Sequence, residues 1–158
     1  VTWGAKESRS EVQLLTDRIL IRVEKANGAV QFLSRDGKKL LTENPSEPRL
    51  LLDSQTWNFF AWDKNERLKS KGVLADDFMD LSTKARYISF GQKKLRMPLV
   101  LSNKGYAIGV AAGSTVLFCN VRTYGQYIYT QGTGQIDYYF IYDENQERNI
   151  EQYRNLPV

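Results

Sequence analysis

Three aspartates close together in the sequence are the residues whose spacing best suits acid–base chemistry. Asp76, Asp77 and Asp80 lie within the irregular stretch 64–81. A glycosidase uses two carboxyl groups on either side of the scissile bond, and carboxylate oxygens also bind calcium. The stretch lacks the alternating acidic positions and the terminal glutamate of an EF-hand loop. A carboxylate site and a set of solvated loop acids both fit this pattern, and the sequence favours solvated acids.

Aromatic residues form a second candidate site. Trp57, Phe59, Phe60 and Trp62 follow one another in a short run, and ring faces can stack on the apolar face of a sugar. Aromatic side chains in strands also fill hydrophobic cores, which is the interpretation that the sequence favours. The same two interpretations apply to six tyrosines, namely Tyr124, Tyr127, Tyr129, Tyr138, Tyr139 and Tyr142.

The missing residue types exclude several kinds of catalysis. The chain contains no histidine, which excludes a Ser-His-Asp triad, a Cys-His pair and a histidine metal site. Its single cysteine, Cys119, lies in an apolar run and is expected to be a buried thiol. No Gly-x-x-x-x-Gly-Lys-Ser/Thr loop is present, and the glycine-rich stretch 132–137 does not lead into a helix. We therefore expect no metal, no cofactor and no catalytic residue.

Basic residues concentrate in one region of a chain whose formal net charge is +4. Aromatic residues lie between these basic residues, as in a groove that binds nucleic acid through phosphate contacts and base stacking. A strand with one solvated face has the same pattern. No helix-turn-helix, zinc-finger or ribonucleoprotein motif accompanies them, so we expect no nucleic-acid partner. The residues of this basic cluster are Lys84, Arg86, Tyr87, Phe90, Lys93, Lys94 and Arg96.

The size and composition of the chain indicate one globular domain spanning residues 1–158. Apolar residues make up 42% of the chain and charged residues 25%, which is ordinary for globular proteins. No apolar run reaches the ~18 residues that span a bilayer, so no membrane partner is expected. The first residues lack the basic and apolar pattern of a signal peptide, which leaves the compartment open between cytoplasm and periplasm.

Short runs of alternating apolar and polar residues, each followed by turn residues, dominate the chain. Ile19, Ile21 and Val23 share one face of such a run, and Asn27 with Gly28 forms a hairpin signal after it. Roughly ten such runs at regular spacing are typical of an all-β antiparallel sandwich or barrel. The predicted strands lie at 18–25, 29–34, 40–43, 49–53, 56–63, 85–90, 97–102, 106–110, 114–121, 126–131 and 135–143.

Two places depart from this pattern of strands. The stretch 64–81 is the least regular part and is expected to be a long loop. Asp137 interrupts an aromatic strand, and we expect its carboxylate to accept hydrogen bonds there rather than to act in catalysis.

A short helix is predicted over residues 144–156. Glu144 and Glu147 lie at its N-terminal end and Arg154 near its C-terminal end, which suits the helix dipole. Pro157 ends it. Its narrow apolar stripe consists of Ile150, Tyr153 and Leu156.

Three stretches, in order along the chain, match the motifs of one known family. "VQFLSRDGKKLLTE" resembles an early strand–turn–strand signature in which Asp-Gly precedes Leu-Leu-x-Glu. "MPLVLSNKGYAI" resembles a Pro-Phe-x-x-Ser-x-Lys-Gly-Tyr-Gly hairpin, and "IDYYFIY", followed by "IEQYRNL", resembles a last strand and an exit helix. Together they resemble the N-terminal β-sandwich of family 31 glycoside hydrolases, over the chain from about Val12 to Leu156.

The resemblance implies a galactose-mutarotase-like β-sandwich whose exit helix leads to a (β/α)₈ catalytic barrel after Val158. In that family both catalytic aspartates lie in the barrel and act through a glycosyl-enzyme intermediate. The resemblance therefore implies a non-catalytic domain of a retaining α-glycosidase that acts on α-glucosides or α-xylosides. Its partners are then the barrel of the same chain and the carbohydrate substrate.

The resemblance also places a loop of the sandwich near the sugar pocket of the barrel. The corresponding stretch is 69–81, in which Gly72 remains while Leu74 and Ala75 replace a glycine and a polar residue. Gln92 lies where the family often has polar residues. These differences indicate altered specificity, or a parent enzyme with weak or no hydrolase activity. With two tryptophans added, the candidate substrate-binding residues are Asp76, Asp77, Gln92, Trp57 and Trp62.

A stand-alone carbohydrate-binding β-sandwich module is the alternative interpretation. It predicts an exposed line of rings on one face of a sheet, containing Trp57 or Trp62.

Overall fold

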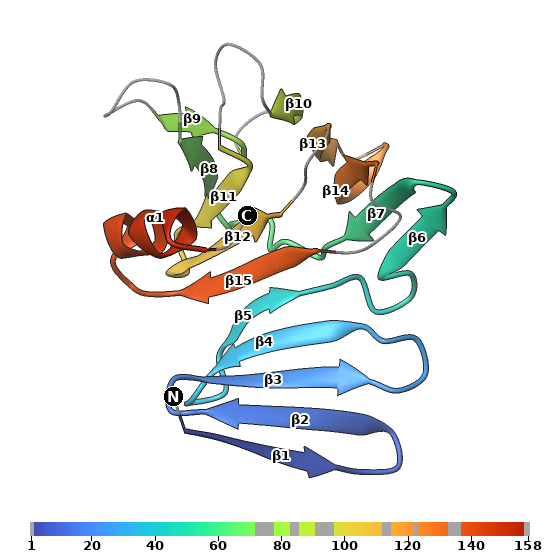
Figure 1. The fold of residues 1–158 in the computed structure, drawn as a ribbon, viewed down its shortest axis with the longest axis vertical. Helices are drawn as coiled ribbons and strands as arrows, with labels where there is room; N and C mark the ends of the chain where they lie inside the picture. The colour runs from blue at the N-terminus through green and yellow to red at the C-terminus, as the bar shows by residue number, and fades with distance from the viewer. Residues whose placement is uncertain are drawn as a thin grey trace.

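The computed structural model describes residues 2–71, 78–82, 86–90, 97–111, 115–121, 123–132 and 137–156, with 86–90 described as backbone only. Within this part of the chain, fifteen strands form three antiparallel sheets of five strands each, and one short helix lies near the C-terminus (Figure 1). The expectation of an all-β antiparallel fold with one C-terminal helix is confirmed.

The first sheet is a meander in which each strand pairs with the next. Its turns contain Gly28 and Gly37 at φ values of 72° and 85°, a conformation that glycine adopts without a steric penalty. The hairpin predicted from Asn27 and Gly28 is therefore confirmed. The strands are β1 (Trp3–Glu7), β2 (Glu11–Thr16), β3 (Ile19–Glu24), β4 (Val30–Ser34) and β5 (Lys39–Thr42).

The second and third sheets are assembled from strands that are distant in sequence. The second sheet runs β10 (Arg86–Phe90), β13 (Val116–Val121), β14 (Gly125–Gln131), β7 (Gln55–Phe59) and β6 (Arg49–Leu52). The third sheet runs β15 (Tyr138–Tyr142), β12 (Tyr106–Val110), β11 (Leu99–Ser102), β8 (Leu68–Lys71) and β9 (Phe78–Asp80).

One hydrophobic core joins the three sheets. Phe32 of β4 stacks on Phe140 of β15, with 3.9 Å between the ring centroids. Trp62, which follows β7, has its ring 5.2 Å from that of Phe118 in β13 and 5.2 Å from that of Phe60. The Phe32–Phe140 contact joins the first and third sheets, and the same cluster includes Phe118 of the second, so its burial holds the sheets against one another.

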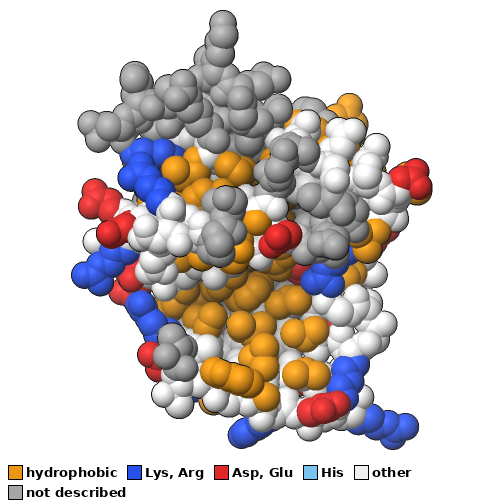
Figure 2. Space-filling model, viewed as in Figure 1, with side chains coloured by type: hydrophobic (Ala, Val, Ile, Leu, Met, Phe, Trp, Pro, Cys, Tyr) orange, Lys and Arg blue, Asp and Glu red, His pale blue; other side chains and the backbone are white. Residues whose placement is uncertain are grey.

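The apolar surface of the first sheet extends beyond this core. Figure 2 shows hydrophobic side chains gathered over the first sheet, in the lower part of the view. Strand β1 is exposed along its whole length, and Trp3 keeps 68% of its surface exposed. Strand pairing with β2 therefore contributes more to holding β1 in place than side-chain burial does.

The helix α1 (Gln146–Arg154) covers the outer face of the third sheet. Ile150 and Tyr153 are buried against residues of β11, β12 and β15, and the Tyr153 hydroxyl donates to the Val110 carbonyl at 3.1 Å. Asn145 is the N-cap, and its side chain accepts a backbone N–H of the first turn. The predicted helix is confirmed, and its apolar stripe packs on the sheet.

Gly109 of β12 lies directly against Tyr153 of the helix. A Cβ atom at this position would come within 2.3 Å of two ring carbons of Tyr153, closer than real Cβ atoms approach other atoms. The helix can therefore reach this distance from the sheet only because residue 109 has no side chain.

Replacing Gly109 with alanine is expected to lower the free energy of unfolding by about 1–3 kcal/mol, the usual cost of adding atoms to a packed core. Chemical denaturation followed by circular dichroism measures this change. Gly4→Ala is the matched control, because nothing lies within 4 Å of a Cβ atom placed there. Equal effects of the two substitutions would contradict the packing argument.

Asp143 joins the start of α1 to the first sheet. Its carboxylate accepts the Asn145 N–H at 2.9 Å, and a guanidinium nitrogen of Arg18 lies 3.4 Å away. Its carbonyl oxygen accepts from the Asn149 side chain at 2.8 Å. The Asn145 hydrogen bond is the main cause that lowers the pKa of Asp143; burial opposes it, and Arg18 lowers the pKa further.

A lowered carboxyl pKa makes the contribution of Asp143 to stability depend on pH. The ionised side chain stabilises the fold above its unfolded-state pKa of about 3.9, and this contribution is lost as the pH falls through the lower folded-state pKa. Asp143→Asn should therefore be less stable than the parent chain at neutral pH, and the difference should shrink in acid. Urea denaturation at a series of pH values measures it; a difference independent of pH would assign the loss to packing.

Three expectations about the strands need correction. The stretch 64–81, expected to be a long loop, contains β8 and β9, which pair with Lys69 opposite Asp80. Lysines alternate with buried residues in β8, so the apolar signal of this strand is weak. Strands β1 and β2 lie outside the predicted set. Asp137 precedes β15 rather than lying within a strand, and it is exposed, with its carbonyl accepting the Ala111 N–H.

Candidate functional site

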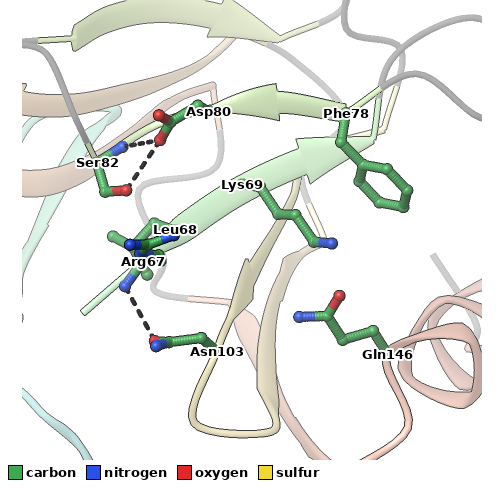
Figure 3. A pocket seen from close by; sticks show the side chains of 8 residues that line it. All are labelled: Arg67, Leu68, Lys69, Phe78, Asp80, Ser82, Asn103 and Gln146. Carbon is green, nitrogen blue, oxygen red and sulfur yellow. Dashed lines mark hydrogen bonds between the residues drawn. The ribbon is translucent and has the colours of Figure 1, made fainter.

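A pocket with charged walls lies where the β8–β9 hairpin meets the start of α1 (Figure 3). It has a volume of about 310 Å³. The third sheet and the helix bring together segments that are up to about eighty positions apart in the sequence. The residues that line it are Arg67, Leu68, Lys69, Phe78, Asp80, Ser82, Asn103 and Gln146.

One lysine and one aromatic ring form one side of this pocket, and a second lysine outside its lining contacts the same ring. The Nζ atom of Lys69 lies 4.1 Å from the ring centroid of Phe78, and the Nζ atom of Lys71 lies 4.7 Å from the same centroid. The ring attracts both cations through its negative face. The Asn103 side chain accepts the backbone N–H of Arg67 at 2.9 Å, which joins the β11–β12 turn to the start of β8 (Figure 3).

Asp80 is the one carboxylate among the described residues that line the pocket. Its Oδ1 atom accepts the backbone N–H and the hydroxyl of Ser82, each at 2.8 Å. A retaining glycosidase needs a second carboxyl group about 5–5.5 Å away. The described part of the pocket can therefore bind a polar ligand through its cations and amides, but it holds no acid–base pair.

Several residues singled out from the sequence lie outside the described residues. Asp76, Asp77 and Gln92 are among them, so their role in substrate binding stays a prediction. The same applies to Lys84, Lys93, Lys94 and Arg96 of the basic cluster, and to the side chains of Arg86, Tyr87 and Phe90.

The two candidate tryptophans lie on opposite sides of the second sheet. Trp62 is 7% exposed and belongs to the core, so it cannot offer a face to a sugar. Trp57 is half-buried on the outer face, where its ring centroid lies 4.9 Å from that of Tyr129. Cys119 is a buried free thiol, as expected from the sequence.

The buried Glu43, which the sequence-based candidates do not include, joins all three sheets. Its Oε2 atom accepts the Val30 N–H of the first sheet at 2.8 Å and lies 2.5 Å from a guanidinium nitrogen of Arg49 in the second. Its Oε1 atom accepts the Tyr138 hydroxyl of the third sheet at 2.8 Å. A glutamate two positions after a pair of core leucines, in the motif "LLTE", was the signal that could have found it.

Glu66 forms a second buried polar centre. Its Oε1 atom accepts the hydroxyls of Ser102, at 2.6 Å, and of Tyr106. Its Oε2 atom lies 3.0 Å from the Nζ atom of Lys104 and accepts the Asp63 N–H at 3.3 Å. Both oxygens thus have two partners, and the glutamate ties the turn before β8 to the β11–β12 hairpin.

The tyrosines beside these glutamates act as hydrogen-bond donors. Burial is the main cause that raises the pKa of Tyr106 and Tyr138, and the neighbouring glutamate raises each pKa further. Each hydroxyl therefore stays protonated and donates to a carboxylate. Because the carboxylates are buried and fully hydrogen-bonded, we assign both glutamates to the stability of the fold rather than to catalysis.

Replacing Glu43 with glutamine is expected to lower the free energy of unfolding by about 3–5 kcal/mol, because it leaves the Arg49 charge without its buried partner. Guanidinium denaturation monitored by tryptophan fluorescence measures the loss. Glu7→Gln removes the exposed partner of Lys25 and serves as the matched control, with little change expected. A small loss at Glu43, similar to that of the control, would show that the three-sheet junction contributes little.

The described part of the chain lacks two further kinds of feature. No group of three or more His, Cys, Asp or Glu side chains there could hold a metal ion. Nor does this part of the chain contain a helix whose length and apolar character would allow it to cross a bilayer.

Comparison with solved structures identifies the fold. A family 31 glycoside hydrolase (GH31) from Flavobacterium johnsoniae, a dextranase, matches with a TM-score of 0.77 and 18% identity over 96% of this chain. The cycloalternan-forming enzyme of Listeria monocytogenes matches with a TM-score of 0.78 and 16% identity over 97% of this chain. A GH31 α-xylosidase from a soil metagenome matches with a TM-score of 0.72 and 19% identity over 97%.

This chain has the fold of a GH31 β-sandwich domain. It spans 20% of the length of the dextranase, 16% of the cycloalternan-forming enzyme and 26% of the α-xylosidase. The resemblance to GH31 is therefore confirmed at the level of the fold. No family model and no curated protein matches the chain.

Proposed function

We propose that this chain is a non-catalytic, N-terminal domain of a GH31 α-glycosidase and that it supports the catalytic barrel of the same polypeptide. The observation that carries the proposal is the match of nearly the whole chain to about a fifth of two larger enzymes, the dextranase and the cycloalternan-forming enzyme. The described residues offer buried, structural glutamates and one pocket carboxylate, which agrees with catalysis lying elsewhere in the polypeptide.

The exit helix supports the connecting role. Its buried residues face the third sheet, whereas Glu147, Arg148 and Glu151 point away and are exposed. A helix whose apolar stripe is already buried on its own sandwich needs no barrel to hold it. It can therefore set the direction in which the chain leaves the sandwich, because Tyr153 and Asn149 fix it to the strands.

The pocket beside β8 and β9 supports a role at the border of the sugar pocket. It lies at the stretch that resembles the substrate-facing loop of the family, and its amides and cations can donate hydrogen bonds to hydroxyl groups. Asp76, Asp77 and Gln92 remain the proposed substrate contacts in this region. The substrate class that we propose is an α-glucoside or an α-xyloside.

Determining the gene sequence after the codon for Val158, followed by activity assays, tests the proposal. We expect the reading frame to continue into a (β/α)₈ barrel and the longer polypeptide to hydrolyse aryl α-glucosides or α-xylosides. Residues 1–158 alone should show no turnover, because the two barrel carboxylates are absent from them. A stop codon directly after Val158, or turnover that stays with the pure domain through purification, would overturn the proposal.

A further inference from the structure

The outer face of the second sheet carries aromatic rings where a solvated sheet face usually carries polar residues. In β7 the polar residues Thr56 and Asn58 point inward, with exposures of 0% and 4%, whereas Trp57 and Phe59 lie on the outer face. This inverts the usual arrangement of apolar side chains inward and polar side chains outward. Both rings are half-buried, so part of each remains accessible on this face.

Strand register places these rings in neighbouring rows. Trp57 is paired with Tyr129 of β14, and Phe59 is paired with Tyr127. The ring centroids are 4.9 Å apart in the first pair and 5.6 Å apart in the second. Since residues two apart on a strand lie roughly 7 Å from one another, the pairs form a short ladder along the sheet.

Amide side chains continue the ladder on the same face. Gln55 and Gln131 are directly opposite each other in register, one row beyond Trp57 and Tyr129. With Leu117 and Thr115 they border a pocket of about 280 Å³ on this face. Among the described residues, none that lines this pocket carries a charge.

This combination of side chains matches the chemistry of a neutral sugar. A pyranose has an apolar face of C–H groups that can lie on an aromatic ring, and a rim of hydroxyl groups that both donate and accept. A glutamine side chain also both donates and accepts, so two of them beside the rings can pair with neighbouring hydroxyls. The pocket volume lies near the lower end of the range of about 300–1,000 Å³ for small-molecule sites, which suits one or two sugar units.

We infer that the outer face of the second sheet is a binding site for a neutral saccharide, with Trp57 and Tyr129 as the stacking surface and Gln55 and Gln131 as the hydrogen-bonding groups. The site lies on a different sheet from the pocket at the β8–β9 hairpin. The inference does not depend on the proposed function, because it rests on the side chains of this face alone.

Titration calorimetry of the folded chain with maltotriose, isomaltotriose and xylotriose tests the inference. At least one of these neutral sugars should bind at millimolar concentration. Trp57→Ala should weaken that binding about tenfold or more, as expected when a central aromatic contact is removed. Trp3→Ala is the matched control, because Trp3 is 68% exposed on β1 of the first sheet and should leave binding unchanged.

Gln55→Leu separates sugar binding from contact with another protein. The substitution keeps the size of the side chain but removes its hydrogen bonds, so sugar binding should fall about twofold to tenfold. An apolar protein interface would instead be preserved or strengthened by the leucine. This variant also decides the question if Trp57→Ala does not fold.

Three results would overturn the inference. The first is a flat titration with all three sugars, and the second is binding that both Trp57→Ala and Gln55→Leu leave unchanged. The third is concentration-dependent self-association in light scattering that Gln55→Leu strengthens, which would assign the face to protein contact. Saturation-transfer NMR adds a direct readout, because transfer to the sugar C–H protons is expected for the parent chain and not for Trp57→Ala.

Discussion

The Glu43 carboxylate is the interaction on which the arrangement of the three sheets depends. It accepts a backbone N–H from β4, pairs with Arg49 of β6 and accepts the Tyr138 hydroxyl of β15. A buried charge is tolerated only when its hydrogen bonds are satisfied, so each sheet must deliver its donor to the same point. Burial of apolar side chains draws the sheets together without specifying direction, whereas this carboxylate accepts only one arrangement of its donors.

The β11–β12 hairpin is also held from both sides, here by packing of apolar side chains. Every residue of β11 and β12 is buried, because one face of the hairpin meets the shared core and the other meets α1. Gly109 allows the helix to approach one of these faces, and Tyr106 donates to Glu66 beneath the other. The helix α1 is therefore part of the packing of the sandwich, which explains how a short helix of nine residues can hold a fixed direction.

The inner faces of the sheets serve stability and the outer faces are available for binding. The buried glutamates have every carboxylate oxygen engaged, while the pocket at β8–β9 and the aromatic face of the second sheet present cations, amides and rings. The same fold occurs within enzymes several times longer than this chain.

The fold class, most strands and turns, the helix with its apolar stripe, and the absence of histidine chemistry can all be predicted from the chain, because they depend on local periodicity and residue type. Which face of each strand is covered depends instead on how the sheets pack. Trp57 and Trp62 are the same residue type in one aromatic run, yet Trp57 lies on the outer face and Trp62 in the core. Alternation along a strand separates two sets of side chains, but it does not tell which set is buried. Glu43 could not be recognised as a junction from local pattern either, since its partners Val30, Arg49 and Tyr138 come from three different sheets.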